Sequence, residues 1–267
     1  MRGVFKSRPL VLLFAANFVS MIGSGMNSAA VTWYILQETH SEQMLGVLVV
    51  AQALPSLLLM PFSGVVIDRE DRRRLIMLLD SGRGLLILLV AILSLRGTVQ
   101  VWHLFAMSVL VSTGFWMFWP TIMALLQELT PEVQFAESNA MLLSGFQAGW
   151  LVAGSIVGFV YAKIGIGGIL LFDASTYAFS VACYWGVRSG RHVVLQASEH
   201  IDKGALSRFW HEMRDGLGFV RSHFSLAMVG LTWSLFVASM MVTSVLTAPL
   251  SDRTLHAGAV GYGWLNA

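Results

Sequence analysis

Long runs of apolar residues, separated by short polar segments, fill most of this 267-residue chain. A helix needs about 20 such residues to cross the hydrocarbon core of a bilayer. Seven runs reach that length, and the alternating pattern of strands is absent, so we predict seven membrane-spanning helices. An eighth run begins near Ala257. The seven predicted helices cover about 10–36, 44–67, 75–95, 101–126, 139–162, 168–187 and 225–250.

Composition supports lipid as the solvent of this chain. Hydrophobic residues make up 56% of it and charged residues 12%, whereas soluble domains carry roughly a quarter charged residues. The single cysteine, Cys183, lies inside an apolar run, which excludes a disulfide framework and a Cys-x-x-Cys metal site. We expect no metal, no other cofactor and no nucleic-acid partner.

The distribution of basic residues predicts the orientation. With the N-terminus in the cytoplasm, thirteen of the seventeen Lys and Arg residues fall in cytoplasmic segments. Arg96, Lys163 and Arg253 fall outside, and Arg83 lies within the membrane. This asymmetry follows the positive-inside rule. We therefore predict a multi-pass protein of the cell membrane with a cytoplasmic N-terminus.

The longest predicted loop divides the chain. Residues 1–187 are expected to form a six-helix bundle, 188–224 a cytoplasmic linker, and 225–267 the start of a second bundle. The second half of the linker has apolar residues at steps of three or four with arginines among them, which predicts an amphipathic helix on the membrane surface. A plain linker and a partner-binding segment both remain open. The apolar positions are Leu206, Phe209, Trp210, Met213, Leu217, Val220 and Phe224.

The loop between the second and third runs carries the most specific motif. It reads Gly64-Val-Val-Ile-Asp68-Arg69-Glu-Asp-Arg72-Arg73-Arg74. It resembles the Gly-x-x-x-Asp-Arg-x-x-Arg-Arg loop between helices 2 and 3 of the major facilitator superfamily. The resemblance implies an all-α transporter of two bundles, in which this loop closes the cytoplasmic side. A basic anchor that only sets orientation is the alternative. The gating role is carried over to Gly64, Asp68, Arg69, Arg72 and Arg73.

Members of that family usually have twelve spans. The chain resembles a complete first bundle, helix 7 and the opening of helix 8. We therefore expect a fragment or a truncated form, whose central cavity has one wall.

Three ionisable residues lie inside predicted spans. Asp80 and Arg83 are three residues apart, which places them on one helix face within reach of an ion pair. A structural pair is favoured over a proton relay. The pair also resembles the Asp-x-x-Arg pair that follows the arginine loop in the branch of the family that contains macrolide-efflux permeases and enterobactin exporters. Asp173 stands alone and is either a capping group or a protonatable site.

The fifth run carries four glycines at spacings of four and five. Such small-xxx-small patterns permit close contact between helix backbones. The segment from Gly154 resembles in part the Gly-Pro-x-x-Gly-Gly end of helix 5 in drug antiporters, but it lacks the proline and the last glycine. Packing alone also explains the glycines, which are Gly145, Gly149, Gly154 and Gly158.

In the family, helices 1, 4 and 7 line the central cavity. A wall of aromatic and methionine side chains with few polar groups suits bulky amphipathic compounds. Pro120 is expected to bend the fourth helix, because it removes a backbone hydrogen bond. The candidate cavity residues are Ser24, Asn27, Phe115, Trp116, Trp119, Trp233, Phe236 and Met240.

These features predict a monomeric efflux transporter of hydrophobic drugs, macrolides or siderophore-like compounds, with protons as the coupling ion. Two departures leave proton coupling open: the fourth helix has no arginine, and Ser24 follows Gly23 where many relatives have an acid. An uptake carrier, a lysolipid flippase and a non-transporting receptor are the alternatives. An enzyme is not expected, because the histidines lie in loops or at interfaces and paired intramembrane aspartates are absent.

Overall fold

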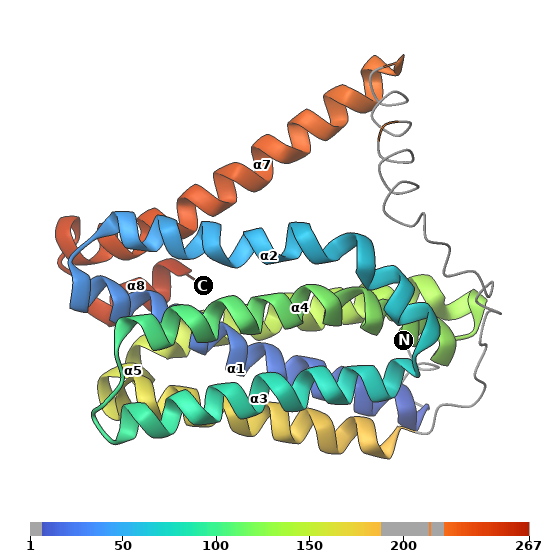
Figure 1. Cartoon of the computed structure of the whole chain (residues 1–267), viewed down its shortest axis with the longest axis horizontal. Coiled ribbons are helices and arrows are strands. Elements are labelled where there is room, and N and C mark those ends of the chain that lie inside the picture. The colour runs from blue at the N-terminus through green and yellow to red at the C-terminus, as the bar shows by residue number, and fades with distance from the viewer. Residues whose placement is uncertain (1–6, 188–213, 215–221, 267) are drawn as a thin grey trace.

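The computed structural model describes residues 7–187, 214 and 222–266, with the backbone alone at 56–65, 68–69, 226 and 266. Every regular element in this part of the chain is helical (Figure 1). The predicted amphipathic helix of the linker lies almost wholly outside the described residues. The elements are α1 (Arg8–Thr39), α2 (Glu42–Arg69), α3 (Arg72–Leu95), α4 (Val101–Leu129), η2 (Glu132–Gln134), α5 (Phe135–Gly186), α7 (Phe224–Pro249), η3 (Leu250–Thr254) and α8 (Gly258–Asn266).

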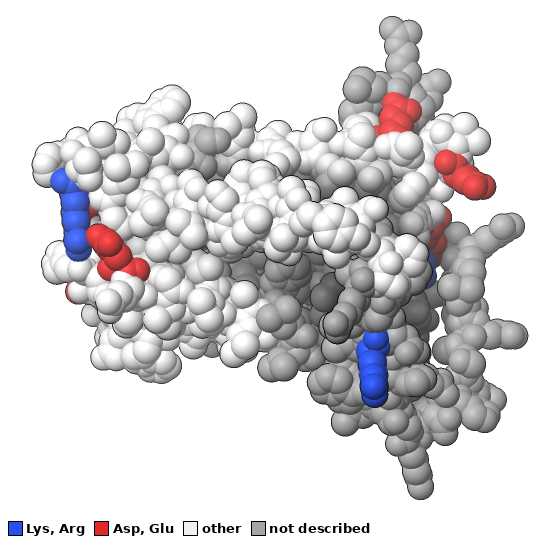
Figure 2. Space-filling model, turned by 90° about the horizontal axis from the view of Figure 1, so that it is seen from above, with Lys and Arg blue, Asp and Glu red and all other residues white. Residues whose placement is uncertain are grey.

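The predicted all-α membrane fold is confirmed. Each of the seven predicted spans lies inside a helix to within one residue at either end. Five stretches of the described chain are long and apolar enough to cross a bilayer, and one of them, at 132–186, has the length of two spans. Figure 2 shows that charged side chains on the face it draws gather at the two ends of the molecule and leave its middle uncharged. This distribution suits a slab of lipid around the middle.

Polar residues begin the helices at the short connections. The Ser41 side chain accepts a hydrogen bond from the backbone N–H of Met44 and so caps α2. The Asp71 side chain accepts from the N–H of Arg74 and caps α3. Residues 70–71 connect α2 to α3 and define one end of the bundle, which we call the arginine-loop end. The α1–α2 connection lies at the opposite end.

The fifth and sixth predicted spans are joined at a single residue. Gly165 has φ +62° and ψ −172°, and helical backbone continues on both sides of it. Only glycine adopts this region readily, because a Cβ would clash with the backbone. We call residues 135–164 the first arm of α5 and residues 166–186 the second arm. The sequence predicts a loop at 163–167. In the structure, Gly165 alone departs from helical backbone angles and makes the turn.

α1 packs against both arms, which run in opposite directions. A Cβ on Gly149 of the first arm would lie 2.7 Å from Met21 Cβ, and one on Gly25 would lie 2.7 Å from Ala153 Cβ. The second arm meets α1 in reverse order, since Asn27 bonds Asp173. Asn17 bonds Tyr184 further along the arm. The chain therefore turns back at Gly165 and encloses α1 in a hairpin.

Replacing Gly165 by alanine is expected to destabilise the bundle. A Cβ at this position meets nothing within 4 Å, so the penalty comes from the backbone alone. A non-glycine residue in such a region costs about 1–3 kcal/mol. Thermal unfolding of the purified protein in detergent measures this loss of stability. Gly82→Ala is the matched control, because Gly82 also faces open space but has no positive φ. An equal loss in both variants would contradict a special role for Gly165.

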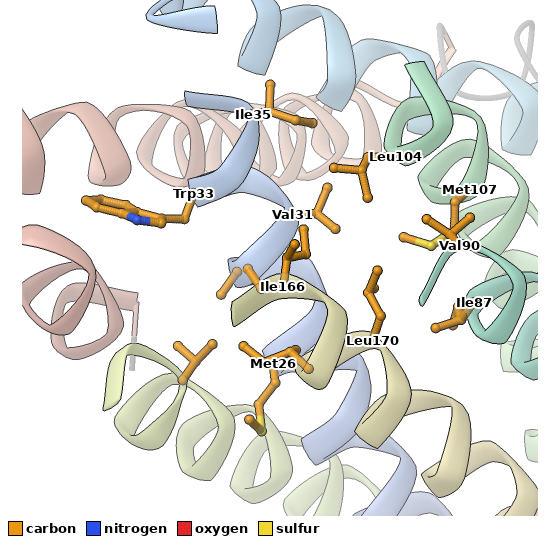
Figure 3. Packing of buried hydrophobic residues seen from close by; sticks show 14 of the residues in the cluster. Met26, Val31, Trp33, Ile35, Ile87, Val90, Leu104, Met107, Ile166 and Leu170 are labelled. Atoms are coloured by element: carbon orange, nitrogen blue, oxygen red, sulfur yellow. The ribbon is translucent and has the colours of Figure 1, made fainter. Parts of the chain in front are cut away.

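Two clusters of buried apolar residues stabilise the bundle, one toward each end. The cluster toward the end opposite the arginine loop joins α1 and the second arm of α5 to α3 and α4 (Figure 3). Val31 of α1, Leu170 of the second arm and Leu104 of α4 are among its members. The other cluster joins the beginnings of α1 and α3 to the end of α4. Both clusters lie around α1. Polar residues on the helices that face α1 must therefore find hydrogen-bond partners inside the bundle.

α7 differs from the other long helices in its exposure. It leaves the body of the molecule and extends toward the arginine-loop end (Figure 1). Most of its side chains are exposed, and burial begins only near its last turn, at Thr247 and Ala248. The π-helix η3 then turns the chain back into α8, which packs against α5.

Candidate functional site

A stripe of polar residues follows one face of the second arm of α5. Each member has another member three or four residues away, the spacing that keeps side chains on the same face of a helix. All of them are buried. The sequence analysis singled out only the first, because hydroxyl groups inside an apolar run carry no strong signal by themselves. The stripe consists of Asp173, Thr176, Tyr177, Ser180 and Tyr184.

Asp173 forms the first polar group of the stripe. Its side chain is fully buried. Asn27 Nδ2 donates to Asp173 Oδ2 at 2.7 Å, and Thr176 Oγ1 donates to Oδ1 at 3.3 Å. A Cβ on Gly23 of α1 would lie 2.5 Å from Asp173 Oδ1, so the glycine makes room for the carboxyl group. No salt bridge reaches Asp173 among the described residues.

Asp80 and Arg83 form the second polar group. Arg83 Nη2 donates to Asp80 Oδ1 in a buried ion pair, as the i, i+3 spacing predicts. Ser180 Oγ donates to the other carboxylate oxygen at 2.6 Å. The pair thus connects α3 with the second arm of α5.

The Arg83 guanidinium also lies between two aromatic rings. Its Cζ is 4.6 Å from the ring centroid of Phe118 on α4 and 4.9 Å from that of Tyr177. Both distances suit cation–π attraction. A Cβ on Gly114 would lie 3.0 Å from Arg83 Cδ, so this glycine of α4 leaves space for the arginine. The Nε of Arg83 is buried and has no hydrogen-bond partner among the described residues. One charged side chain therefore joins α3, α4 and α5.

The remaining stripe residues bond to α1. Ser24 Oγ lies 3.1 Å from the hydroxyl oxygen of Tyr177. Asn17 Nδ2 donates to the Tyr184 hydroxyl at 2.7 Å. Ser24 and Asn27 were both predicted as cavity residues, which stays a prediction; the structure places their polar groups against the second arm of α5. In this conformation their side chains satisfy buried polar partners.

The arginine loop connects three helices at its end of the bundle. Arg72 Nη1 pairs with Glu128 Oε2 of α4 at 3.5 Å. Arg73 donates from Nε to the Tyr184 carbonyl oxygen at 2.7 Å and from Nη2 to that of Trp185. These carbonyls belong to the last turn of α5, where the helix dipole favours a cation. The sequence analysis missed this contact, because its two parts are more than a hundred residues apart.

Three other predicted gating residues are described as backbone only. Gly64 lies in the described helical backbone of α2, and so do Asp68 and Arg69 at its end. The side chains of Asp68 and Arg69 are outside the described part of the structure, so their gating role stays a prediction.

The glycines of the first arm serve two different partners. Gly149 packs against α1. Gly158 packs against α8, where its Cβ would lie 2.5 Å from Val260 Cα. The backbone oxygen of Gly154 would lie 2.8 Å from a Cβ on Gly263 of α8. A Cβ on Gly145 would meet no described atom within 4 Å. The glycines of the first arm thus contact α1 in the middle of the arm and α8 at its end.

Two further contacts hold α8 and η3 at the end opposite the arginine loop. Trp33 of α1 stacks on Tyr262 of α8 with ring centroids 5.5 Å apart. Arg253 of η3 donates from Nη1 to Glu42 Oε1 at 2.8 Å and from Nη2 to the His40 carbonyl oxygen at 2.9 Å. We call these contacts, together with the glycine contact between α5 and α8, the outer clasp, because they lie at the end farther from the arginine loop.

The aromatic cavity candidates have different surroundings. Phe115 and Trp119 pack against Phe146 of the first arm, at centroid distances of 6.0 and 5.1 Å. α4 runs through Pro120 as one helix. The remaining candidates are more than half exposed and make up the open surfaces of α4 and α7. They are Trp116, Trp233, Phe236 and Met240.

Comparison with known families agrees with this architecture. Residues 13–247 match the sequence model of the Major Facilitator Superfamily. The chain belongs to the major facilitator superfamily. It is therefore a multi-pass membrane protein of a transporter family. Membership explains the arginine loop as a family feature.

Several characterised and uncharacterised members are similar to the chain. Macrolide efflux protein A of Streptococcus pyogenes is 24% identical over 227 residues, which cover 82% of this chain and 53% of that protein. The multidrug efflux pump Tap of Mycolicibacterium fortuitum is 26% identical over 166 residues, or 60% and 40%. The MFS-type transporter YkuC of Bacillus subtilis is 28% identical over 182 residues, or 66% and 41%. The chain thus spans about half or less of the length of these relatives.

Proposed function

We propose that this protein is a secondary active transporter that exports hydrophobic or amphipathic compounds by alternating access, with protons as the coupling ion. The observation that carries the proposal is the similarity of most of the chain to a protein named for macrolide efflux, alongside a second named for multidrug efflux. The exposed aromatic and methionine side chains of α7 would suit contact with a hydrophobic substrate, which supports the proposal.

The two ends of the bundle supply the contacts that alternating access has to break and remake. We assign the arginine-loop end to the cytoplasm, because basic residues gather there. The outer clasp then lies on the external side. α7 leaves the bundle toward the arginine-loop end while the clasp holds the other end (Figure 1). This geometry is the one expected of a carrier that is closed to the outside.

Drug accumulation in a pump-deficient bacterial host tests the proposal. The host expresses the protein from its whole reading frame and receives macrolides and fluorescent amphipathic dyes. Export predicts lower accumulation than in cells with the empty vector, and collapse of the proton gradient should restore it. An uptake carrier would raise accumulation instead. A receptor or a carrier of other substrates would leave it unchanged, and either outcome would overturn the proposal.

Asp173 is our candidate for the proton-coupling group. It is a buried carboxyl group that no described basic residue pairs with, and it bonds α1 to the second arm of α5 through Asn27. A change in its protonation alters that contact between two helices. An ionisable group is costly to bury at this depth, and such groups in membrane proteins often mark proton pathways.

Replacing Asp173 by asparagine should therefore abolish gradient-driven export while leaving substrate exchange intact. The side chain keeps its size and its position beside Asn27 but no longer ionises. Gradient-driven transport and gradient-free exchange are measured in proteoliposomes, with Asp252→Asn as the control at an exposed carboxylate. Full gradient-driven transport in Asp173→Asn would exclude the coupling role. Loss of both activities would indicate a structural role alone.

A further inference from the structure

A groove of about 530 Å³ lies between α3 and the second arm of α5. These two elements lie side by side along the lower edge of the molecule in Figure 1. Leu85 and Leu88 of α3 form one side, and Leu171 and Val181 of the second arm form the other. The groove is separate from the outer clasp and from the aromatic surfaces of α4 and α7.

Small residues on the facing surfaces create the hollow. Ser81 of α3 and Ala174, Ser175 and Ala178 of the second arm line it. The helices touch behind it, because a Cβ on Gly84 would lie 2.9 Å from Tyr177 Cβ. Leucines at the rim then extend past a floor of small side chains, which leaves a channel rather than a flat seam.

The depth of the groove places it among acyl chains. Asp80 lies eight residues into α3, which corresponds to about 12 Å along the helix axis at 1.5 Å per residue. Leu88 lies about 12 Å further on. The groove therefore occupies the middle of a hydrocarbon core about 30 Å thick, away from the headgroups at either surface.

Its mouth is continuous with the surface that faces lipid. Leu85 is 64% exposed and Leu171 45% exposed at the rim. On helices that cross a membrane, such outward apolar side chains contact hydrocarbon. The neighbouring Leu89 and Phe172 extend the same apolar surface beyond the groove.

Water is a poor occupant of this space. A buried water needs two to four polar partners. The one carboxylate at the floor, Asp80, already accepts from Arg83 and from Ser180. The Ser175 hydroxyl donates to the Phe172 carbonyl oxygen. An empty groove would leave its lining without contacts on one side, which loses dispersion energy.

We propose that this groove is a binding site for one acyl chain of a bilayer phospholipid. The chain fills the hollow between the leucine rims and excludes water from the Asp80–Arg83 pair behind it. The proposal rests on the membrane fold and not on the direction or substrate of transport.

Photolabelling tests the site. The whole chain is reconstituted in nanodiscs with phosphatidylglycerol that carries a diazirine at the middle of one acyl chain, and labelled residues are mapped by mass spectrometry. Labels are expected to concentrate on residues 81–88 and 171–181 rather than to spread over the exposed face of α7. In Ala178→Phe the added ring fills the groove, and labelling there should fall about tenfold, corresponding to a loss of about 1.4 kcal/mol in binding free energy.

Ala182→Phe is the matched control, because Ala182 is exposed on the same arm but does not line the groove. It should leave the labelling pattern unchanged. Even labelling of all apolar surfaces in the wild-type protein would overturn the proposal without reference to any variant. So would an equal loss in both phenylalanine variants. Displacement of the label by a macrolide would identify the groove as a substrate site instead.

Discussion

Replacing Asp80 by alanine is expected to be the most destabilising single change in the bundle. It leaves the Arg83 guanidinium buried between Phe118 and Tyr177 without its counter-ion. Removing one partner of a buried ion pair costs about 3–5 kcal/mol, because the remaining charge stays desolvated. The loss is larger than that from any single hydrogen bond of the polar stripe, at about 1 kcal/mol.

The single cysteine of the chain supplies the measurement. Cys183 is buried in the second arm of α5, so a thiol-reactive fluorescent maleimide reports its exposure as the bundle unfolds on heating. Asp80→Ala should strongly lower the midpoint temperature of the labelling transition, and Ser180→Ala should lower it slightly. The double variant Asp80→Ala/Arg83→Met removes both charges and should recover most of the loss. A double variant as unstable as the single one would show that the pair is not the source of the effect.

Replacing Gly158 by alanine is expected to impair transport far more than folding. A Cβ there meets the backbone of Ala259 and Val260 on α8, which side-chain rotation does not relieve. α8 has to move away, and the outer clasp opens. Overpacking costs about 1–3 kcal/mol. A bias of that size against the closed state corresponds to a 5- to 150-fold change in its population.

Accessibility from outside measures that change. In a Cys183→Ser background, Ala29 is replaced by cysteine, because Ala29 is 2% exposed and lines one small cavity together with Gly158 and Tyr262 of the clasp. Gly158→Ala should increase its labelling by a membrane-impermeant maleimide and reduce transport of the identified substrate. Gly145→Ala is the matched control, since it adds the same methyl group to the same arm in open space. Unchanged labelling in Gly158→Ala would contradict a gating role for the contact.

Local patterns in the sequence predict what depends on neighbouring residues. Apolar runs of membrane length predict the helices, because spanning backbone must satisfy its hydrogen bonds within the segment. The Asp80–Arg83 pair follows from a spacing of three on one helix. The family is also readable from the chain, because the loop motif places its glycine and charges in a short stretch.

Contacts between distant segments escape such patterns. Asn27 and Asp173 are 146 residues apart, and neither residue indicates the other. Arg73 is basic in a loop where the positive-inside rule already explains it, so its bonds to the end of α5 carry no separate signal. The glycines of the first arm predict close packing but not the division between α1 and α8.

The sequence by itself determined the positions of the apolar spans, the membrane setting and the transporter family, because hydrophobic length and charge position act locally. Only the tertiary structure decided that the chain reverses at Gly165, and that a polar stripe on the second arm faces α1 and α3. The reason is physical. Once a bilayer surrounds the helices, buried polar groups must find partners on other helices, and which ones they meet depends on how the hairpin encloses α1.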